Sequence, residues 1–172
     1  MSLLTFARRR FADLIYPEGG ERRDQLEREA NFDPLTGFAN RRALLRALPS
    51  AEAAPDTLVV LFDANNFRQV NKAAGHMAGD DLLCEIASAI SLAARRFGYG
   101  VRVFRWGGDE FVVLASSNTA YYIRDEAEEG FGVRTIAGAR ISLTGVVGKT
   151  IEEADAQLQA RKSARKVEDE HR

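Results

Sequence analysis

Three acidic residues, Asp63, Asp109 and Glu110, lie next to apolar segments, where a carboxylate is unusual unless it has a chemical role. Asp63 follows a run of apolar residues, 58–62, that is typical of a buried strand. Asp109 and Glu110 follow a Gly-Gly pair between two apolar, β-rich segments, a pattern that predicts a hairpin. Carboxylates gathered at the edge of a sheet repel one another unless a cation lies between them. Because Mg²⁺ prefers carboxylate and phosphate oxygens, these acids indicate a site for a metal ion and a nucleotide.

The same residues have a plainer interpretation, which their spacing leaves open. Asp63 could cap a following helix, and Asp109 and Glu110 could be ordinary acidic turn residues. Gly107 and Gly108 favour the ligand interpretation, because a turn without side chains lets the backbone approach a phosphate or a ribose closely. A Gly-Gly pair also serves hairpin geometry alone, so by itself it does not decide between the two.

The elements that must position these acids follow from the hydrophobic pattern. A helix is expected to open at Asp33, with Asp33 as its N-cap, and to run through Leu45 before a loop over residues 50–56. After Asp63, a short helix or loop leads to a turn marked by Gly75, His76 and Gly79. The remaining segments are a helix over 80–96, strands over 101–106 and 111–115, a helix over 118–129, strands over 132–137 and 140–147, and a helix over 150–168. This order predicts an α/β fold with a central, mainly antiparallel sheet flanked by helices.

The first thirty residues differ in pattern from the rest. Residues 1–16 carry apolar side chains at helical spacing, and the Pro and Gly residues of 17–20 are expected to break that helix. Charges of alternating sign over 21–32 indicate a solvated connector or a short coiled coil. We therefore expect a helical extension and linker over 1–30 and one domain over 31–172.

The composition limits the classes of partner and the cell compartment that we expect. The net charge of −1 lacks the basic excess of nucleic-acid-binding domains, so no nucleic-acid partner is expected. The single cysteine, Cys84, excludes an intrachain disulfide and fits a reducing compartment. The longest apolar runs, about five residues, are too short to cross a membrane. These features favour a cytoplasmic chain with no membrane segment of its own, and they leave room for a sensory domain upstream in a longer protein.

Residues 105–111 read Arg-Trp-Gly-Gly-Asp-Glu-Phe, which contains the five-residue signature of GGDEF domains unaltered. Other segments match the family's pattern: Asp-Pro-Leu-Thr-Gly at 33–37 with Ala-Asn-Arg-Arg at 39–42, Asp-Ala-Asn-Asn-Phe-Arg at 63–68, and Asn71 with Gly-His at 75–76 and Gly-Asp at 79–80. Over about residues 30–166 the chain therefore resembles the GGDEF family of diguanylate cyclases. The resemblance implies a GGDEF fold of the kind shared by nucleotide cyclases and the polymerase palm.

The resemblance also implies a role for each matching acid. Asp63 and Asp109, with the backbone carbonyl of Ala64, would hold Mg²⁺ or Mn²⁺. Glu110 would be a further metal ligand or would help to deprotonate the attacking hydroxyl. Asp109 and Glu110 are thus the expected catalytic pair.

The contacts to GTP are implied in the same way. The amides of Asn66 and Phe67 would receive the terminal phosphates at a helix start, where free N–H groups point outwards. Asn71 and Asp80 would read the guanine edge, although Asp80 could instead cap a helix that begins there. The expected substrate-binding residues are Asn66, Phe67, Arg68, Asn71, Asp80, Gly107, Gly108, Lys162 and Lys166.

Lys162 and Lys166 stand one turn apart on the final predicted helix, where the resemblance implies neutralisation of the triphosphate. Family members usually carry Arg at the second position, and Arg and Lys differ in the geometry of their phosphate contacts. A solvated basic helix end is the alternative.

The implied reaction is phosphoryl transfer, in which the 3′-hydroxyl of one GTP attacks the α-phosphate of a second and pyrophosphate leaves. Because each domain would hold one GTP, a homodimer is expected. The segment between Phe111 and Gly145 is short for the family, which keeps a second hypothesis open: a catalytically weak regulatory module that binds GTP or cyclic di-GMP. A third is a dimerisation scaffold that binds no nucleotide.

Overall fold

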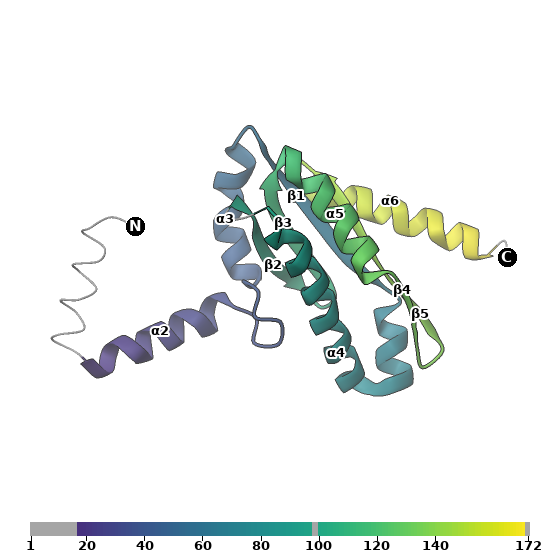
Figure 1. Ribbon diagram of the computed structural model, residues 1–172, viewed down its shortest axis with the longest axis horizontal. Helices are drawn as coiled ribbons and strands as arrows, with labels where there is room; N and C mark the ends of the chain where they lie inside the picture. Colours follow the sequence, from purple (N-terminus) through teal and green to yellow (C-terminus); the bar gives the residue numbers. More distant parts are fainter. Residues whose placement is uncertain (1–16, 98–99, 171–172) are drawn as a thin grey trace.

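The computed structural model describes the backbone of residues 17–97 and 100–170, and the side chains of 22, 25–97 and 100–164. The predicted helix over 1–16 lies outside the described residues. Figure 1 shows the elements in chain order. They are α2 (Pro17–Asn31), α3 (Arg41–Ala53), β1 (Thr57–Asn65), α4 (Phe67–Arg95), β2 (Arg102–Gly107), β3 (Glu110–Ser116), α5 (Ser117–Phe131), β4 (Val133–Ile136), β5 (Ala139–Gly148) and α6 (Ile151–Glu170).

The strands form one antiparallel sheet in the order β2-β3-β1-β5-β4, which confirms the predicted fold class. β1 lies at the centre and pairs on both sides. In its register Asp63 stands opposite Glu110 of β3 and Thr144 of β5. The sheet topology therefore places two acids that are distant in the sequence on directly opposite positions of neighbouring strands.

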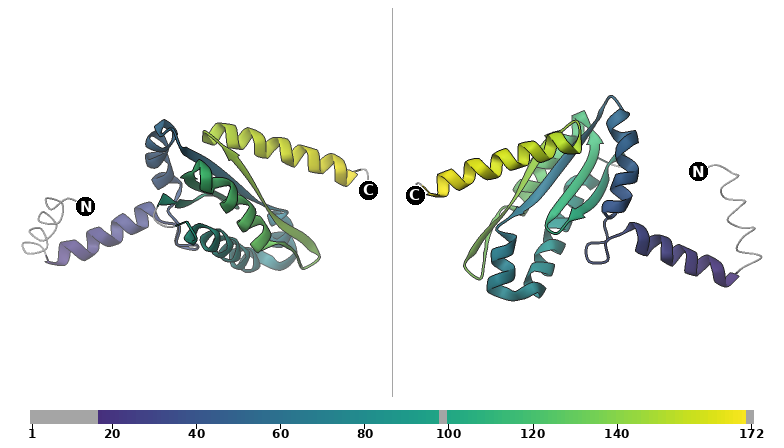
Figure 2. Two further views of the ribbon diagram at one scale, coloured as in Figure 1. Left: turned by 45° about the horizontal axis from the view of Figure 1, so that its top comes forward. Right: turned by 180° about the vertical axis from the view of Figure 1, so that it is seen from behind.

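Helices cover both faces of the sheet, with α4 and α5 on one face and α3 and α6 on the other, while α2 projects away from the sheet (Figures 1 and 2). Side chains of β1 alternate between the two cores. Val60 and Phe62 pack under α4 and α5, whereas Val59 and Leu61 pack under α3 and α6. Asp63 continues the second set with a period of two, so its side chain belongs to the face that α6 covers.

α6 brings a cation to the same place. Its fully buried residues, Ala154 and Leu158, lie four positions apart and belong to the core between α6 and the sheet. Lys162 lies four positions further along, on the same stripe of the helix. The apolar stripe that docks α6 thus ends with an ammonium group at the level of Asp63.

The start of the domain differs from the prediction. Residues 33–40 form a turn, and Gly37 has a φ of 72°, which no α-helix accommodates. The N-cap of α3 is Asn40, whose side chain accepts a hydrogen bond from the amide of Ala43. The prediction of a helix capped by Asp33 was therefore wrong, and α3 also continues further than predicted, to Ala53.

α2 begins with the Pro and Gly residues of 17–20, because Pro is tolerated in a first helical turn and each Gly costs only about 1 kcal/mol. The predicted break between these residues and 1–16 lies outside the described residues. The predicted turn over 75–79 differs from the structure. α4 is interrupted at Gly75, with φ 86° and ψ 169°, and resumes directly after it. His76 and Gly79 are helical, so the predicted turn is confined to Gly75. Asp80 lies inside the resumed helix, so the alternative that Asp80 caps it was wrong.

Over the described residues, no helix combines the length and the apolar character that crossing a bilayer requires.

Candidate active site

The acids singled out from the sequence meet at one end of β1. Asp63 is buried, with 7% of its side chain exposed. Asp109 lies in the hairpin turn between β2 and β3, and Glu110 is the first residue of β3. The amide of Ala64 donates a hydrogen bond to the carbonyl of Asp109 over 3.2 Å, which ties the hairpin turn to β1. The hairpin turn is formed by residues 108 and 109, so Gly107 ends β2 and lies outside the turn in which it was predicted.

These acids hold excess negative charge. Burial raises the pKa of Asp109, and the charge of Asp63 raises it further. Burial likewise raises the pKa of Glu110, again with Asp63 as the largest charged contributor, and the charge of Lys162 only partly opposes it. A cation beside these carboxylates would relieve the repulsion.

The protein already supplies one cation. Lys162 donates a hydrogen bond from Nζ to Oδ2 of Asp63 over 2.6 Å. The side chain of Lys162 is itself 36% exposed and remains in contact with water. The buried carboxylate of Asp63 is therefore the partner that needs the ion pair to offset the cost of burying its charge. The ion pair was not foreseen from the sequence, although the shared stripe with Leu158 on α6 was a usable signal.

The structure allows a test of whether a divalent metal fits. Within the described part of the chain, no group of three or more His, Cys, Asp or Glu side chains is placed to hold a metal ion. The donor set nevertheless suits Mg²⁺ or Mn²⁺, because Asp63, Asp109, Glu110 and the carbonyl of Ala64 offer only oxygen. Phosphate and water oxygens would complete the coordination. Binding at Oδ2 of Asp63 would require Lys162 to leave.

The start of α4 has the geometry of an anion site. Asn66, its N-cap, has a left-handed φ of 64° and makes no side-chain cap hydrogen bond. Its Nδ2 instead donates to the carbonyl of Arg140 over 2.8 Å. The N-cap side chain therefore leaves the amides of the first turn, including that of Phe67, to other acceptors. Arg68 is exposed in the same turn, and its charge acts to lower the pKa of Asp109.

The proposed base-reading residues lie further along α4. Oδ1 of Asn71 is buried, and no described residue donates a hydrogen bond to it. The amide lies against Gly79, where an added Cβ would stand only 1.9 Å from Oδ1. Asp80, the next residue, is exposed. The missing side chain of Gly79 thus makes the space in which Asn71 presents an unpaired acceptor.

The basic end of α6 is only partly described. Lys162 contacts Asp63 and lies beside the acid cluster. Lys166 lies one turn further along α6, but its side chain lies outside the described residues. The predicted contact of both lysines with a triphosphate remains a prediction.

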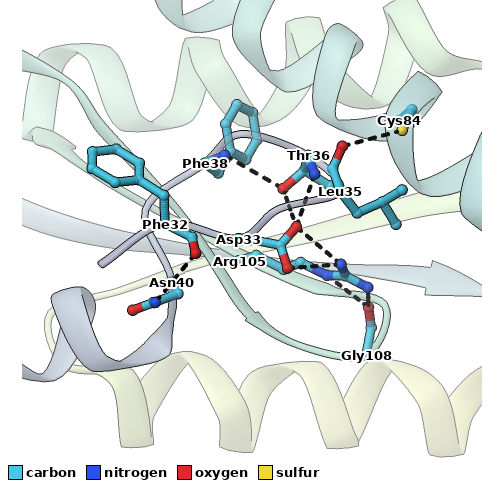
Figure 3. Close-up of polar contacts among 9 residues, drawn as sticks. All are labelled: Phe32, Asp33, Leu35, Thr36, Phe38, Asn40, Cys84, Arg105 and Gly108. Atoms are coloured by element: carbon cyan, nitrogen blue, oxygen red, sulfur yellow. Dashed lines mark hydrogen bonds and ion pairs between the residues drawn. The ribbon is translucent and has the colours of Figure 1, made fainter. Parts of the chain in front are cut away.

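Sequence reasoning missed a second ion pair, next to the hairpin. Nη1 of Arg105 donates to both carboxylate oxygens of Asp33 over 3.0 Å. Nε and Nη2 of the same guanidinium donate to the carbonyl of Gly108 over 3.2 and 2.7 Å (Figure 3). A usable signal was the spacing of Asp33 and Thr36, which is typical of an aspartate that holds its own turn.

Comparisons with known proteins point to one family. Residues 30–129 match the family model described as "Diguanylate cyclase, GGDEF domain". Diguanylate cyclase DgcM of Escherichia coli (strain K12) is 38% identical over 96 residues, which cover 53% of this chain and 23% of that protein. Cyclic di-GMP phosphodiesterase PdeB of Shewanella oneidensis is 37% identical over 97 residues, which cover 56% of this chain and 11% of that protein. The chain thus spans less than a quarter of the length of these two relatives.

Solved structures show the same fold. The coiled coil and GGDEF domain of DgcB from Caulobacter crescentus, solved in complex with c-di-GMP, aligns with a TM-score of 0.72 at 24% identity. The alignment covers 93% of this chain and 95% of that chain. At this level of identity the likeness concerns the fold alone.

Proposed function

Since the chain belongs to the GGDEF family, we propose that it is a diguanylate cyclase, which condenses two molecules of GTP into cyclic di-GMP and two of pyrophosphate. The observation that carries the proposal is the meeting of the acids at the end of β1. Asp63 and Glu110 stand opposite each other in the sheet, and the turn that holds Asp109 is bonded to Ala64. The signature residues are thereby joined to a central strand, as phosphoryl transfer requires of groups that must be held rigidly.

In each transfer, the 3′-hydroxyl of one GTP forms a bond to the α-phosphorus of the other, and the bond to the pyrophosphate oxygen breaks. Glu110 is the group that we assign to accept the hydroxyl proton, because it stands opposite Asp63 in the sheet and directly after Asp109, the two residues that would hold the metal. Asp63 and Asp109 are the residues that would hold Mg²⁺ or Mn²⁺, with the carbonyl of Ala64. A bound divalent ion supplies charge neutralisation at the transferring phosphoryl group.

The substrate lies along α4 in this proposal. The phosphates occupy the uncapped helix start at Asn66 and Phe67, near Arg68. Asn71 and Asp80 accept hydrogen bonds from the N–H groups of guanine, an edge that adenine does not present. The buried, unpartnered Oδ1 of Asn71 supports this assignment, because such an acceptor gains most from a ligand donor.

Two chains must meet for the reaction, since each site holds one GTP and each GTP is both nucleophile and electrophile. We therefore propose a homodimer with the two sites face to face. The rate per chain should rise with protein concentration until the dimer is saturated. Because GTP is a cytoplasmic metabolite, we also place this domain in the cytoplasm.

The test is chromatography of the products after concentrated protein is incubated with GTP and Mg²⁺. Cyclic di-GMP is expected from the unaltered chain and not from Asp109→Ala or Glu110→Ala. Glu129→Ala is the matched control, because Glu129 is an exposed acid of α5, which covers the face of the sheet opposite to α6. Equal product from the unaltered chain and from both site variants would contradict the proposal.

A second candidate is a regulatory module that binds GTP or cyclic di-GMP without turnover. Two observations favour it: the similar proteins include two that are named cyclic di-GMP phosphodiesterases, and Lys162 is paired with the carboxylate that a metal would need. Nucleotide binding measured by calorimetry, with no product across a concentration series, would select the module. Absence of binding would instead leave a scaffold.

A further inference from the structure

The tip of the β2–β3 hairpin is weakly defined by its own strands. The register of the ladder shifts between Arg105 and Gly107, which is the mark of a β-bulge. Gly108 then has a φ of 32°, and a Cβ at Gly107 or Gly108 would meet nothing within 4 Å. Two glycines beside a bulge, without packing neighbours, leave the backbone before Asp109 a wide choice of conformations. Something outside the ladder must fix it.

The guanidinium of Arg105 does so on one side. It donates from Nε and Nη2 to the carbonyl of Gly108, the residue directly before Asp109. On the other side, the carbonyl of Asp109 accepts from the amide of Ala64. The carbonyls of Gly108 and Asp109 are therefore held by different parts of the molecule. Together these two contacts set the direction in which the side chain of Asp109 points away from the backbone.

Arg105 is in turn held by the segment that connects α2 to α3. Asp33 accepts from Nη1 of Arg105 with both of its oxygens, and it also accepts from the amide and hydroxyl of Thr36 over 2.9 and 2.7 Å (Figure 3). The backbone adds a bond from the amide of Arg105 to the carbonyl of Ala39 over 2.8 Å. The connector and the hairpin tip are thus joined through one side chain.

The pair is built to remain charged and ordered. Only 16% of the Arg105 side chain and 17% of the Asp33 side chain are exposed. Burial acts to raise the pKa of Asp33, but the hydrogen bonds from Thr36 and the charge and hydrogen bond of Arg105 outweigh it and hold the pKa below its ordinary value. A planar guanidinium offers donors on two edges at once, whereas the three donors of an ammonium share one nitrogen, which would have to lie within reach of both acceptors.

We propose that Arg105 is a positioning residue for the cyclase reaction, which tethers the carbonyl of Gly108 to Asp33 and so makes the orientation of Asp109 depend on the connector between α2 and α3. The inference rests on the proposed function for its catalytic consequence. Its structural part, the tether itself, holds for the chain without nucleotide. A change in the orientation of α2 would be transmitted to the hairpin through the side chain of Arg105.

The structural part is tested first, by hydrogen–deuterium exchange of the nucleotide-free chain. Arg105→Ala and Asp33→Ala should each speed the exchange of amides over residues 107–111, with exchange in α5 unchanged. Arg102→Ala is the control, because Arg102 is an exposed arginine of the same strand. Unchanged exchange at 107–111 in Arg105→Ala would overturn the proposal, whether or not the chain makes cyclic di-GMP.

The catalytic part is tested by steady-state kinetics. Because a small misplacement of a reacting group can cost up to about 100-fold, Arg105→Ala should lower kcat by roughly 10- to 100-fold and leave KM for GTP within about threefold. The kcat of the double variant Asp33→Ala, Arg105→Ala should be no lower than that of Arg105→Ala. The kcat of Arg105→Lys should lie between those of the parent and of Arg105→Ala. A residue that only stabilises the fold would lower the melting temperature without this kcat effect. That result, or effects of the two single variants that multiply, would contradict the proposal.

Discussion

The two ends of the proposed nucleotide site satisfy their polar groups in different ways. At the hairpin end, two acids have a cation of the protein, Arg105 for Asp33 and Lys162 for Asp63, whereas Asp109 and Glu110 keep pKa values raised by burial and by the charge of Asp63. At the base end, Oδ1 of Asn71 is buried with no donor among the described residues. An unpaired buried polar atom costs roughly 1–3 kcal/mol, so the base end retains an unfavourable term that a ligand can remove.

This difference indicates how each end responds to a nucleotide. At the base end, Oδ1 of Asn71 gains a hydrogen-bond donor from the nucleotide and no existing contact has to break. The residues of this end should therefore govern the affinity for GTP. The hairpin end must exchange Lys162 for a metal ion or phosphate at Asp63, so its residues should govern chemistry more than affinity. Predictions that separate kcat from KM therefore test the comparison directly.

The largest effect is expected at Asp63. Asp63→Asn keeps the shape of the side chain but removes the charge that would hold the metal, so the rate of cyclic di-GMP formation should fall by roughly 1,000-fold or more. Lys162, which is partly exposed, can turn to solvent, so the fold should persist. Asp125→Asn is the matched control, because Asp125 is an exposed aspartate of α5, on the other face of the sheet from α6. A variant rate within tenfold of the parent would place the chemistry elsewhere.

The base end is tested by Gly79→Ala. The new methyl group would displace the amide of Asn71, because the added Cβ stands 1.9 Å from Oδ1. KM for GTP should rise by roughly tenfold, which corresponds to about 1.4 kcal/mol, with a smaller change in kcat. Gly130→Ala serves as control, since a Cβ at that helical glycine meets nothing within 4 Å. An unchanged KM would remove Asn71 from the recognition of GTP.

The exchange at the hairpin end is tested by Lys162→Met. Without the ammonium, Asp63 is a buried carboxylate with no ion-pair partner, so the melting temperature without metal should fall by roughly 2–8 °C. Mn²⁺ should then bind more tightly than to the parent when no nucleotide is present, because it no longer competes with Lys162. Electron paramagnetic resonance of free Mn²⁺ measures this affinity. Weaker Mn²⁺ binding in the variant would show that Lys162 does not compete with the metal.

The sequence was most informative where periodicity and local chemistry agree. The continuous run of apolar residues before Asp63 predicted the central strand, and the Gly-Gly pair predicted the hairpin. Both depend on patterns that a short stretch of chain contains in full. The antiparallel fold class followed from the order of such segments and is confirmed.

What the sequence did not reveal depends on contacts between distant segments. The pairs Asp33–Arg105 and Lys162–Asp63 join residues 72 and 99 positions apart. The local signals, the Asp33–Thr36 spacing and the apolar stripe of α6, concern only one partner of each pair and do not identify the other. Asp33 was assigned to a helix cap because aspartate before proline fits that role, whereas its hydrogen bonds to Thr36 and Arg105 hold a turn. The competing turn chemistry prevailed over helix propensity there.

The smallest expected effect is a gain in stability from a variant that destroys activity. Burial and the charge of Asp63 raise the pKa of Asp109, which means that its ionised carboxylate destabilises the fold at pH 7. Asp109→Asn removes this charge, so the nucleotide-free variant should melt roughly 1–3 °C above the parent at pH 7. Because the folded-state pKa lies above the ordinary value of 3.8, the parent regains this stability as the pH falls through the raised pKa, and the difference should vanish below 3.8. Differential scanning calorimetry from pH 3 to 7, with Glu129→Gln as the exposed control, measures it. A variant that melts below the parent at pH 7 would show that the repulsion among the acids is already relieved without a metal, and the contrast between the two ends of the site would then rest on Asn71 alone.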